Sequence, residues 1–208
     1  MEYLIQIGIG ILVSLVGAYI QAVTGVLDKL IPFLRFRNAG VVKIYKNQEK
    51  AKKSILKDIE KSKILHLLAM KGESFSHHNR DFHDVLYNAN IKQRYLISAI
   101  DNPYLKKRGS ELDMDMEECI NLSVANFEKA KKKNNNVQIG RHKEVVRFRI
   151  ILLSEYLYLS FQKVNIPGKK SSILKIKKNC PMYESFSSLF NDLWEKYCGE
   201  ELSLSIEK

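Results

Sequence analysis

The chain has 208 residues, of which 45% are hydrophobic and 27% are charged, so it can form one domain with an appendage and is neither wholly disordered nor a polytopic membrane protein. Three scattered cysteines, Cys119, Cys180 and Cys198, exclude a disulfide scaffold and a zinc module, and indicate a reducing compartment. The net charge of +11 indicates a partner that carries phosphate, such as a lipid headgroup, a nucleotide or a nucleic acid.

Residues 3–27 contain no charged side chain. At about 1.5 Å per residue, this run can cross a hydrocarbon core of about 30 Å as a tilted helix. A cleaved signal peptide fits less well, because Glu2 precedes the run and no small-residue cleavage site follows it. A buried core helix would be shorter. We therefore expect a transmembrane helix within residues 1–34, followed by a basic juxtamembrane linker at residues 35–46.

The flank of this segment is strongly basic. Residues 29–63 hold eleven Lys or Arg residues against three acidic ones, a net charge of +8. Because positive flanks stay in the cytoplasm, we expect a single-pass protein of the cell membrane, with its N-terminus outside and its C-terminal domain in the cytoplasm. Lys29, Arg35, Arg37 and Lys43 are the candidates for contact with anionic lipid headgroups. Lipid accounts for the basic charge, so direct binding of nucleic acid is not expected.

Small and polar residues recur along the apolar run at close to the helical period. They are Glu2, Gln6, Gly10, Ser14, Gly17, Gln21, Thr24 and Asp28. In lipid, small residues let helices approach and amides hydrogen-bond between them. The stripe therefore predicts homo-oligomers, in which it forms either a simple helix–helix contact or the lining of a pore. The candidate residues for this face are Gln6, Gly10, Ser14, Gly17, Gln21 and Thr24.

The rest of the chain alternates between apolar runs typical of strands and amphipathic segments typical of helices. We expect strands at residues 41–45, 64–69, 94–100, 145–154, 156–162 and 173–178, and helices at 47–62, near 82–90, at 113–133 and at 181–199. The two runs that meet at Ser154 and Glu155 predict a tight hairpin. This order predicts an α/β domain with one mixed sheet covered by helices.

Four segments in this order resemble the phospholipase D-like fold, in the form of a single half-domain. They are ILHLLAMKGESF, RYLISAIDNP, VVRFRIILLSEYLYLSF and SFSSLFNDLWEKY. The resemblance implies a phospholipase D-like cytoplasmic domain at residues 41–199, with a tail at 200–208. Active members of this superfamily carry a His-x-Lys-x4-Asp motif whose His is the phosphodiester nucleophile.

Aligned on the hairpin, Arg147 stands in place of that His, Arg149 in place of Lys and Ser154 in place of Asp. A guanidinium is not a nucleophile at any working pH, so we expect no catalytic residue and no enzyme. Arg147 and Arg149 lie two residues apart on one face of a strand, which suits bidentate contact with phosphate. Pairing of both arginines with acidic neighbours is an equally good interpretation.

Other candidate residues follow the second strand. Gly72, Ser74 and Arg80 belong to a region where α/β sheets often bind ligands. His77, His78 and His83 have unsuitable spacing for a metal site, so no metal and no cofactor are predicted. We expect His66 to be a hydrogen-bonded core residue and His142 to lie on a hairpin surface.

The combination of a polar-striped span, a polybasic flank and a degenerate phospholipase D-like domain is similar in architecture to membrane effectors of prokaryotic defence, such as those found beside short Argonaute proteins. It implies an effector that oligomerises and depolarises the membrane in antiviral abortive infection, when a partner sensor or a second-messenger system activates it. One alternative is a membrane-tethered signalling module that binds a nucleotide or an anionic lipid through phosphate. A second alternative is a phosphodiesterase.

Overall fold

The computed structural model describes residues 38–76 and 80–204. The expected transmembrane helix at residues 1–34, its candidate polar face and the candidate lipid contacts Lys29, Arg35 and Arg37 lie outside these ranges. The chain divides into a unit of residues 1–39 and a compact unit from Gly40 to Lys208, and only the second is described below. Among the described residues, no helix combines the length and the apolar character needed to cross a membrane.

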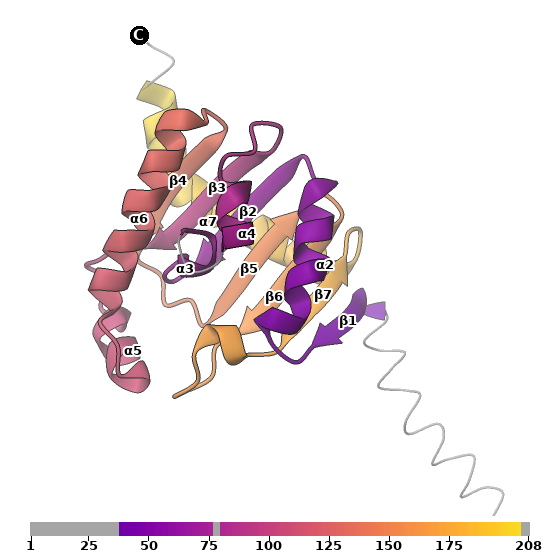
Figure 1. The fold of residues 1–208 in the computed structure, drawn as a ribbon, viewed down its shortest axis with the longest axis horizontal. Coiled ribbons are helices and arrows are strands. Elements are labelled where there is room, and N and C mark those ends of the chain that lie inside the picture. Colours follow the sequence, from indigo (N-terminus) through magenta and orange to yellow (C-terminus); the bar gives the residue numbers. More distant parts are fainter. Residues whose placement is uncertain (1–37, 77–79, 205–208) are drawn as a thin grey trace, which may run out of the picture. The chain divides into compact units, whose positions relative to one another are not determined.

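The described domain is built on one mixed sheet of seven strands in the order β1-β7-β6-β5-β2-β3-β4 (Figure 1). The strands are β1 (Val41–Tyr45), β2 (Ile64–Ala69), β3 (Lys92–Ser98), β4 (Val137–His142), β5 (Phe148–Leu153), β6 (Tyr156–Phe161) and β7 (Ile173–Lys177). β2, β3 and β4 are parallel, whereas β5, β6, β7 and β1 join by antiparallel pairing. The α/β fold class and the single mixed sheet are therefore confirmed.

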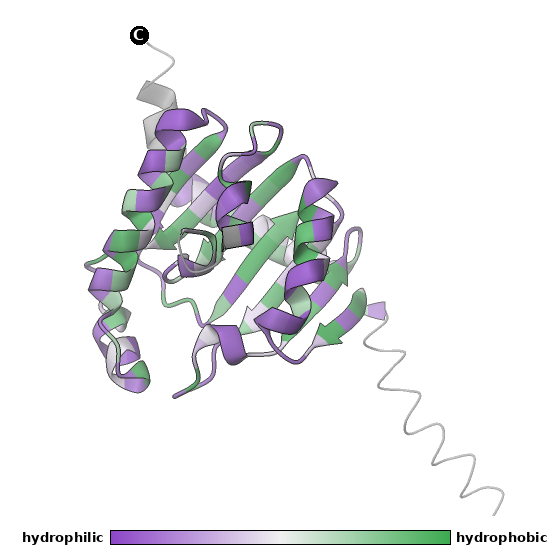
Figure 2. Ribbon diagram, viewed as in Figure 1, coloured by the Kyte–Doolittle hydropathy of each residue, from purple (hydrophilic) through white to green (hydrophobic). Residues whose placement is uncertain are grey.

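Most of the helices cover one face of this sheet (Figure 1). They are α2 (Gln48–Glu60), α3 (Glu73–Ser76), α4 (Arg80–Val85), α5 (Tyr104–Leu112) and α6 (Met116–Lys133), and a short 3-10 helix, η1 (Gly168–Lys170), follows β6. Along α2, Ala51, Ile55 and Ile59 recur every four residues and are buried, because this spacing places them on the side of the helix that faces the sheet. The central strands are mostly apolar, whereas the helices alternate between polar and apolar residues (Figure 2).

The opposite face is covered by the last helix, α7 (Pro181–Leu204). Phe190 and Trp194 pack against Leu68, Leu96 and other side chains of this face. Alternation along each strand decides which residues meet which layer. In β5, Ile150 and Leu152 contact the α7 layer, whereas Arg149 points to the layer of α2 to α6.

Several expectations were wrong in detail. The segment 104–112 is helical, as α5, although no periodic apolar pattern marks it in the sequence. Gly199 does not end the last helix, which continues to Leu204, because a single internal glycine costs a helix only about 1 kcal/mol. His142 is not on a hairpin surface: it is 1% exposed and is the last residue of the edge strand β4. His66 is buried as expected, but its ring stacks on Phe190 and neither ring nitrogen has a hydrogen-bond partner among the described residues.

Candidate functional site

A pocket opens at the carboxyl ends of the parallel strands β2 and β3. It lies between the residues that follow β2, the start of β5, the end of β6, the α5–α6 connection and η1. Its volume is about 210 Å³. Since pockets for drug-sized molecules start at about 300 Å³, this one suits a single chemical group or one end of a larger ligand. Ligands of open α/β sheets bind at these same strand ends.

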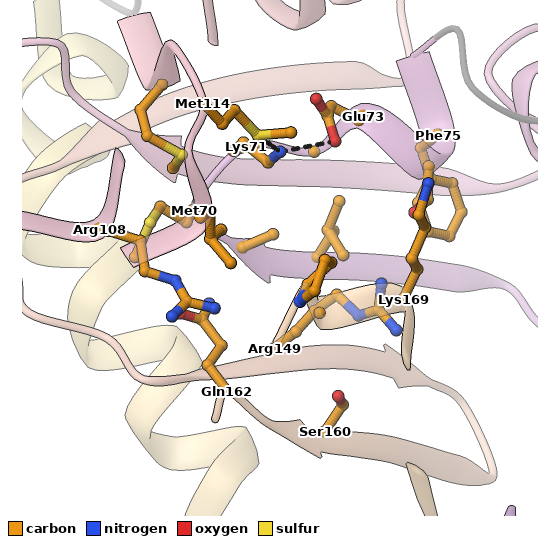
Figure 3. A pocket seen from close by; sticks show the side chains of 18 residues that line it. Met70, Lys71, Glu73, Phe75, Arg108, Met114, Arg149, Ser160, Gln162 and Lys169 are labelled. Atoms are coloured by element: carbon orange, nitrogen blue, oxygen red, sulfur yellow. Dashed lines mark hydrogen bonds and ion pairs between the residues drawn. The ribbon is translucent and has the colours of Figure 1, made fainter. Parts of the chain in front are cut away.

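Arg149 is the central charged residue of this pocket (Figure 3). Its Nη1 donates a hydrogen bond to Oε1 of Gln48, at 2.8 Å. No carboxylate of the described residues lies within ion-pair distance of its guanidinium. Desolvation lowers the pKa of Arg149 to about 10, so the side chain still carries a full positive charge at neutral pH. The pocket therefore holds a cation whose charge the described protein does not neutralise.

Gln48 connects Arg149 with the loop after β2. The Oε1 atom that accepts from Arg149 also accepts a hydrogen bond from the hydroxyl of Ser74, at 3.2 Å. Asn47 caps the helix that begins at Gln48, with its side chain accepting from the backbone N–H of Lys50 at 3.1 Å. The start of α2 thus fixes the amide that orients the arginine.

Three polar side chains from the end of β6 and from η1 complete the same pocket. In the antiparallel register Ser160 lies opposite Arg149, and Gln162 lies opposite Arg147. Gln162 has a buried Oε1 atom with no hydrogen-bond partner among the described residues. Lys169 is exposed at the pocket, and its side chain lies at the same end as Arg149 (Figure 3). Two cations and two neutral polar groups therefore border one space.

The remaining charged groups of the pocket have partners. Lys71 pairs with Glu73, with 2.9 Å between Nζ and Oε2. Arg108 is buried: its Nη1 contacts Glu111 at 2.6 Å and the carbonyl oxygen of Lys163 at 3.0 Å. Its Nη2 donates to the carbonyl oxygen of Ile166, also at 3.0 Å. These contacts hold the segment between β6 and η1 in place, so Arg108 shapes the pocket wall.

The two arginines of the degenerate motif have different environments. Arg147 is half exposed and lies 3.7 Å from a carboxylate oxygen of Glu111, with its guanidinium 5.1 Å from the centre of the Tyr104 ring. It does not line the pocket. Arg147 therefore has an acidic neighbour, as the pairing interpretation expects, whereas Arg149 has none among the described residues.

Ser154, at the third motif position, lies at the hairpin turn, away from the pocket. Its hydroxyl accepts hydrogen bonds from the backbone N–H of Lys63 at 3.0 Å and from Ser62 at 3.1 Å, which ties the hairpin to the start of β2. His66, stacked on Phe190, faces α7, and no histidine of the described residues lines the pocket.

Of the loop candidates, Gly72 and Ser74 both line the pocket. Gly72 has φ +76°, and its carbonyl oxygen accepts from the backbone N–H groups of Phe75 and Ser76, which starts α3. Its contribution is conformational. Arg80 begins α4, and its side chain lies outside the described part of the structure, as do His77 and His78.

No known protein family and no curated protein sequence matches the chain. Among solved structures, the chain is similar to NucT from Helicobacter pylori, with a TM-score of 0.50 and 11% identity over 74% of this chain and 96% of that one. NucT belongs to the phospholipase D family. The described domain has a phospholipase D-like fold.

Two further structures are more distant. Nuc from Salmonella typhimurium, a phospholipase D family member, has a TM-score of 0.46 and 16% identity over 74% of this chain and 94% of that one. TrmBL2, an archaeal chromatin protein with a novel mode of DNA binding, has a TM-score of 0.48 and 13% identity over 88% of this chain. The chain spans 64% of TrmBL2.

Sequence reasoning missed Gln48, Ser160, Gln162 and Lys169. The hairpin itself contained a signal for two of them, because a turn at residues 154 and 155 places Ser160 opposite Arg149 and Gln162 opposite Arg147. Gln48 and Lys169 approach through tertiary packing and had no local signal.

Proposed function

We propose that the protein is a non-catalytic, membrane-tethered receptor for a phosphate-bearing ligand, which it binds through Arg149. The observation that carries this proposal is the unneutralised Arg149 cation in a pocket with predominantly apolar walls. Burying an uncompensated charge is costly, and a ligand anion would remove that cost. A guanidinium also presents paired N–H donors whose geometry matches phosphate oxygens.

The neighbouring side chains support an anionic ligand. Lys169 adds a second positive charge at the same end of the pocket. Ser160 offers a hydroxyl donor at the pocket wall. Because the pocket volume is about 210 Å³, we expect it to enclose a phosphate group with an adjoining small moiety, the rest of the ligand remaining outside.

Binding rather than hydrolysis is proposed because the position of the nucleophile is occupied by Arg147, which pairs with Glu111 outside the pocket. A guanidinium cannot form the covalent phosphoryl intermediate. Turnover of a phosphodiester by the pure protein would contradict this part of the proposal.

The test is calorimetric titration of the full chain, in lipid nanodiscs, with inorganic phosphate, glycerol phosphate and nucleoside monophosphates. Arg149→Gln should weaken binding of the probe that binds best by about 10- to 100-fold, the value of a charge-assisted hydrogen bond. Arg147→Gln, two residues away and just before β5, is the matched control and should leave the affinity unchanged. Equal affinity of Arg149→Gln and the unmodified chain would overturn the proposal, as would the absence of binding to all of the probes.

A second candidate function is motivated by the polar stripe of residues Gln6 to Thr24 in the sequence. We propose that ligand-loaded or partner-activated chains assemble through this stripe and depolarise the membrane, as an effector in antiviral defence. One helix cannot form a pore. The switch would therefore be the change from separate chains to a pair or ring of assembled helices. A sensor protein, such as a short Argonaute complex, or a second-messenger system would supply the signal.

Membrane potential measured on induced expression tests this second function. Replacement of Gln6, Ser14 and Gln21 by Leu should abolish depolarisation while the protein stays in the membrane fraction, because leucine keeps the span apolar and removes the polar face. Cells that remain polarised when the activated protein is abundant would exclude the effector function. This result would not bear on ligand binding through Arg149, which the calorimetric titration tests separately.

A further inference from the structure

The outward face of α2 carries a continuous row of lysines. Lys50, Lys53, Lys57 and Lys61 follow one another at steps of three and four residues, so they share one side of the helix. All four are exposed. The buried residues Ala51, Ile55 and Ile59 lie on the opposite side and pack into the core. The four lysines, called the α2 lysine face below, therefore point directly away from the domain.

None of these lysines forms an ion pair with a carboxylate of the described residues. No acidic residue of α2 forms an ion pair with them: Asp58 pairs with Lys175 at 2.6 Å, and Glu49 and Glu60 make no ion pair within the described domain. Like charges three or four residues apart destabilise a helix, and Lys50 stands in the first turn, where the helix dipole disfavours a cation. Glu49 in the first turn and Lys57 in the last turn are favoured by the same dipole, so helix stability accounts for part of this arrangement but not for the run of like charges.

We infer that the α2 lysine face is a docking surface by which the folded domain lies on an anionic lipid bilayer. The inference depends on neither Arg149 nor its ligand. Lys43 belongs to the same side of the domain: it lies two residues before Tyr45, which is buried under α2, and adjacent strand positions alternate between faces. Lys43, expected from the sequence to contact headgroups, thus adds to the positive charge on this side.

The chemistry of the surface favours a bilayer over a nucleic acid. It consists of lysines on a convex helix, which are flexible point charges suited to a diffuse sheet of negative charge. Nucleic-acid surfaces combine arginine, hydroxyl and amide groups, or aromatic rings that stack on bases, and the α2 lysine face contains none of these. The uncharged segment at residues 3–27, which the sequence assigns to the membrane, would also keep the domain near lipid.

Lysine acetylation, measured by mass spectrometry on the full chain in nanodiscs, tests this inference. One set of nanodiscs contains phosphatidylcholine alone, and the other contains phosphatidylcholine mixed with phosphatidylglycerol. We expect the anionic lipid to slow acetylation of Lys50, Lys53 and Lys57 several-fold and high salt to restore it. Lys131 and Lys132, exposed at the end of α6, are internal controls whose acetylation should not change.

Variants give the energetic test. Each lysine close to an anionic surface contributes about five-fold to the docking equilibrium, so replacing Lys50, Lys53 and Lys57 by Gln should weaken docking about a hundred-fold. In this triple variant, anionic nanodiscs should no longer protect Lys61 from acetylation. Replacing Lys129, Lys131 and Lys132 by Gln removes the same charge from α6 and should leave Lys61 protected. Equal acetylation of the α2 lysine face in both nanodiscs would overturn the inference, and so would protection by a duplex oligonucleotide without protection by anionic lipid.

Discussion

Gly72 is the residue at which the backbone next to the pocket is most constrained. Its φ of +76° belongs to a region that residues with a Cβ atom rarely adopt. A Cβ atom there would lie 2.8 Å from Cδ1 of Ile97 and 2.9 Å from Cε2 of Phe127. Both neighbours are fully buried, so neither can move without disturbing the core.

We therefore expect Gly72→Ala to lower the free energy of unfolding by about 2 kcal/mol or more, from backbone strain and steric overlap together. Gly168→Ala is the matched control, because no atom lies within 4 Å of the position that the new methyl group would occupy, and it should be neutral or slightly stabilising. Denaturant unfolding of both variants measures the difference. Similar stabilities for the two variants would show that this loop can relax.

A second residue-scale prediction concerns His66, which is buried against Phe190. Desolvation, with smaller contributions from Arg94 and Lys92, lowers the pKa of His66 to about 4. Below its ordinary pKa of 6.5 the unfolded chain binds a proton that the folded chain does not bind. The stability contributed by the neutral imidazole is therefore complete above pH 6.5 and is lost as the pH falls towards 4.

The free energy of unfolding should accordingly decrease by about 1 to 2 kcal/mol between about pH 7 and pH 5. His66→Leu, which cannot titrate, should flatten this part of the profile. Burial also lowers the pKa of His142, so a smaller slope of the same sign should remain in the variant. A variant with the full slope of the unmodified chain would exclude His66 as the main source.

The degenerate motif illustrates what residue types alone could predict. Two arginines two residues apart predicted a shared strand face, but Arg147 lies just before β5 and only Arg149 lies within it; the environment of each depends on neighbours that are distant in sequence. Glu111 and Tyr104 of α5 contact Arg147, and Gln48 of α2 contacts Arg149. Since α5 has no clear pattern in the sequence, residue types alone could not distinguish the paired arginine from the one in the pocket.

Among the elements, the two helix-flanking aspartates Asp113 and Asp115 have opposite roles. Asp115 caps α6: its Oδ1 accepts from the backbone N–H groups of Glu117 at 2.9 Å and Glu118 at 3.0 Å. Asp113 ends α5 in the left-handed conformation, with φ 49°. The same residue type thus satisfies helix donors at one position and tolerates an unusual backbone at the other.

Asp115→Ala should cost about 1 kcal/mol of stability, because two N–H groups lose their acceptor. Asp113→Gly should be neutral or stabilising, because glycine adopts positive φ without strain. Thermal unfolding of the two variants gives the comparison. An unchanged midpoint for Asp115→Ala would mean that solvent replaces the cap.

Elements rich in apolar residues were easier to predict from the sequence than elements with few of them. The continuous apolar runs of β2, β5 and β6 identified these strands and the hairpin at Ser154 and Glu155 directly. α5 was missed because its sequence, YLKKRGSEL, contains a glycine and few apolar residues. The predicted end of α7 was wrong because a single glycine, Gly199, is only a weak stop signal and the helix continues to Leu204.

On the scale of the whole domain, the sheet divides the core into two layers that differ in the number of helices covering them. The layer of α2 to α6 is formed by several helices, each covering part of the sheet. In the other layer α7 is the only described helix. It packs across the strands from β7 to β4. A weakened α7 would therefore expose a complete face of apolar side chains to water, so docking of α7 and folding of the sheet should be one cooperative process.

Trp194, the single tryptophan of the chain, allows a test of this cooperativity. It is 4% exposed, stacks near Phe190 and lies under the guanidinium of Arg94 at 5.0 Å. In denaturant, its fluorescence and the far-ultraviolet circular dichroism should change at the same midpoint. Phe190→Ala should lower the stability by about 3 to 5 kcal/mol and move both midpoints together. A fluorescence transition that precedes the loss of secondary structure would mean that α7 undocks from a sheet that remains folded, because only α7 and the sheet face beneath it surround the indole.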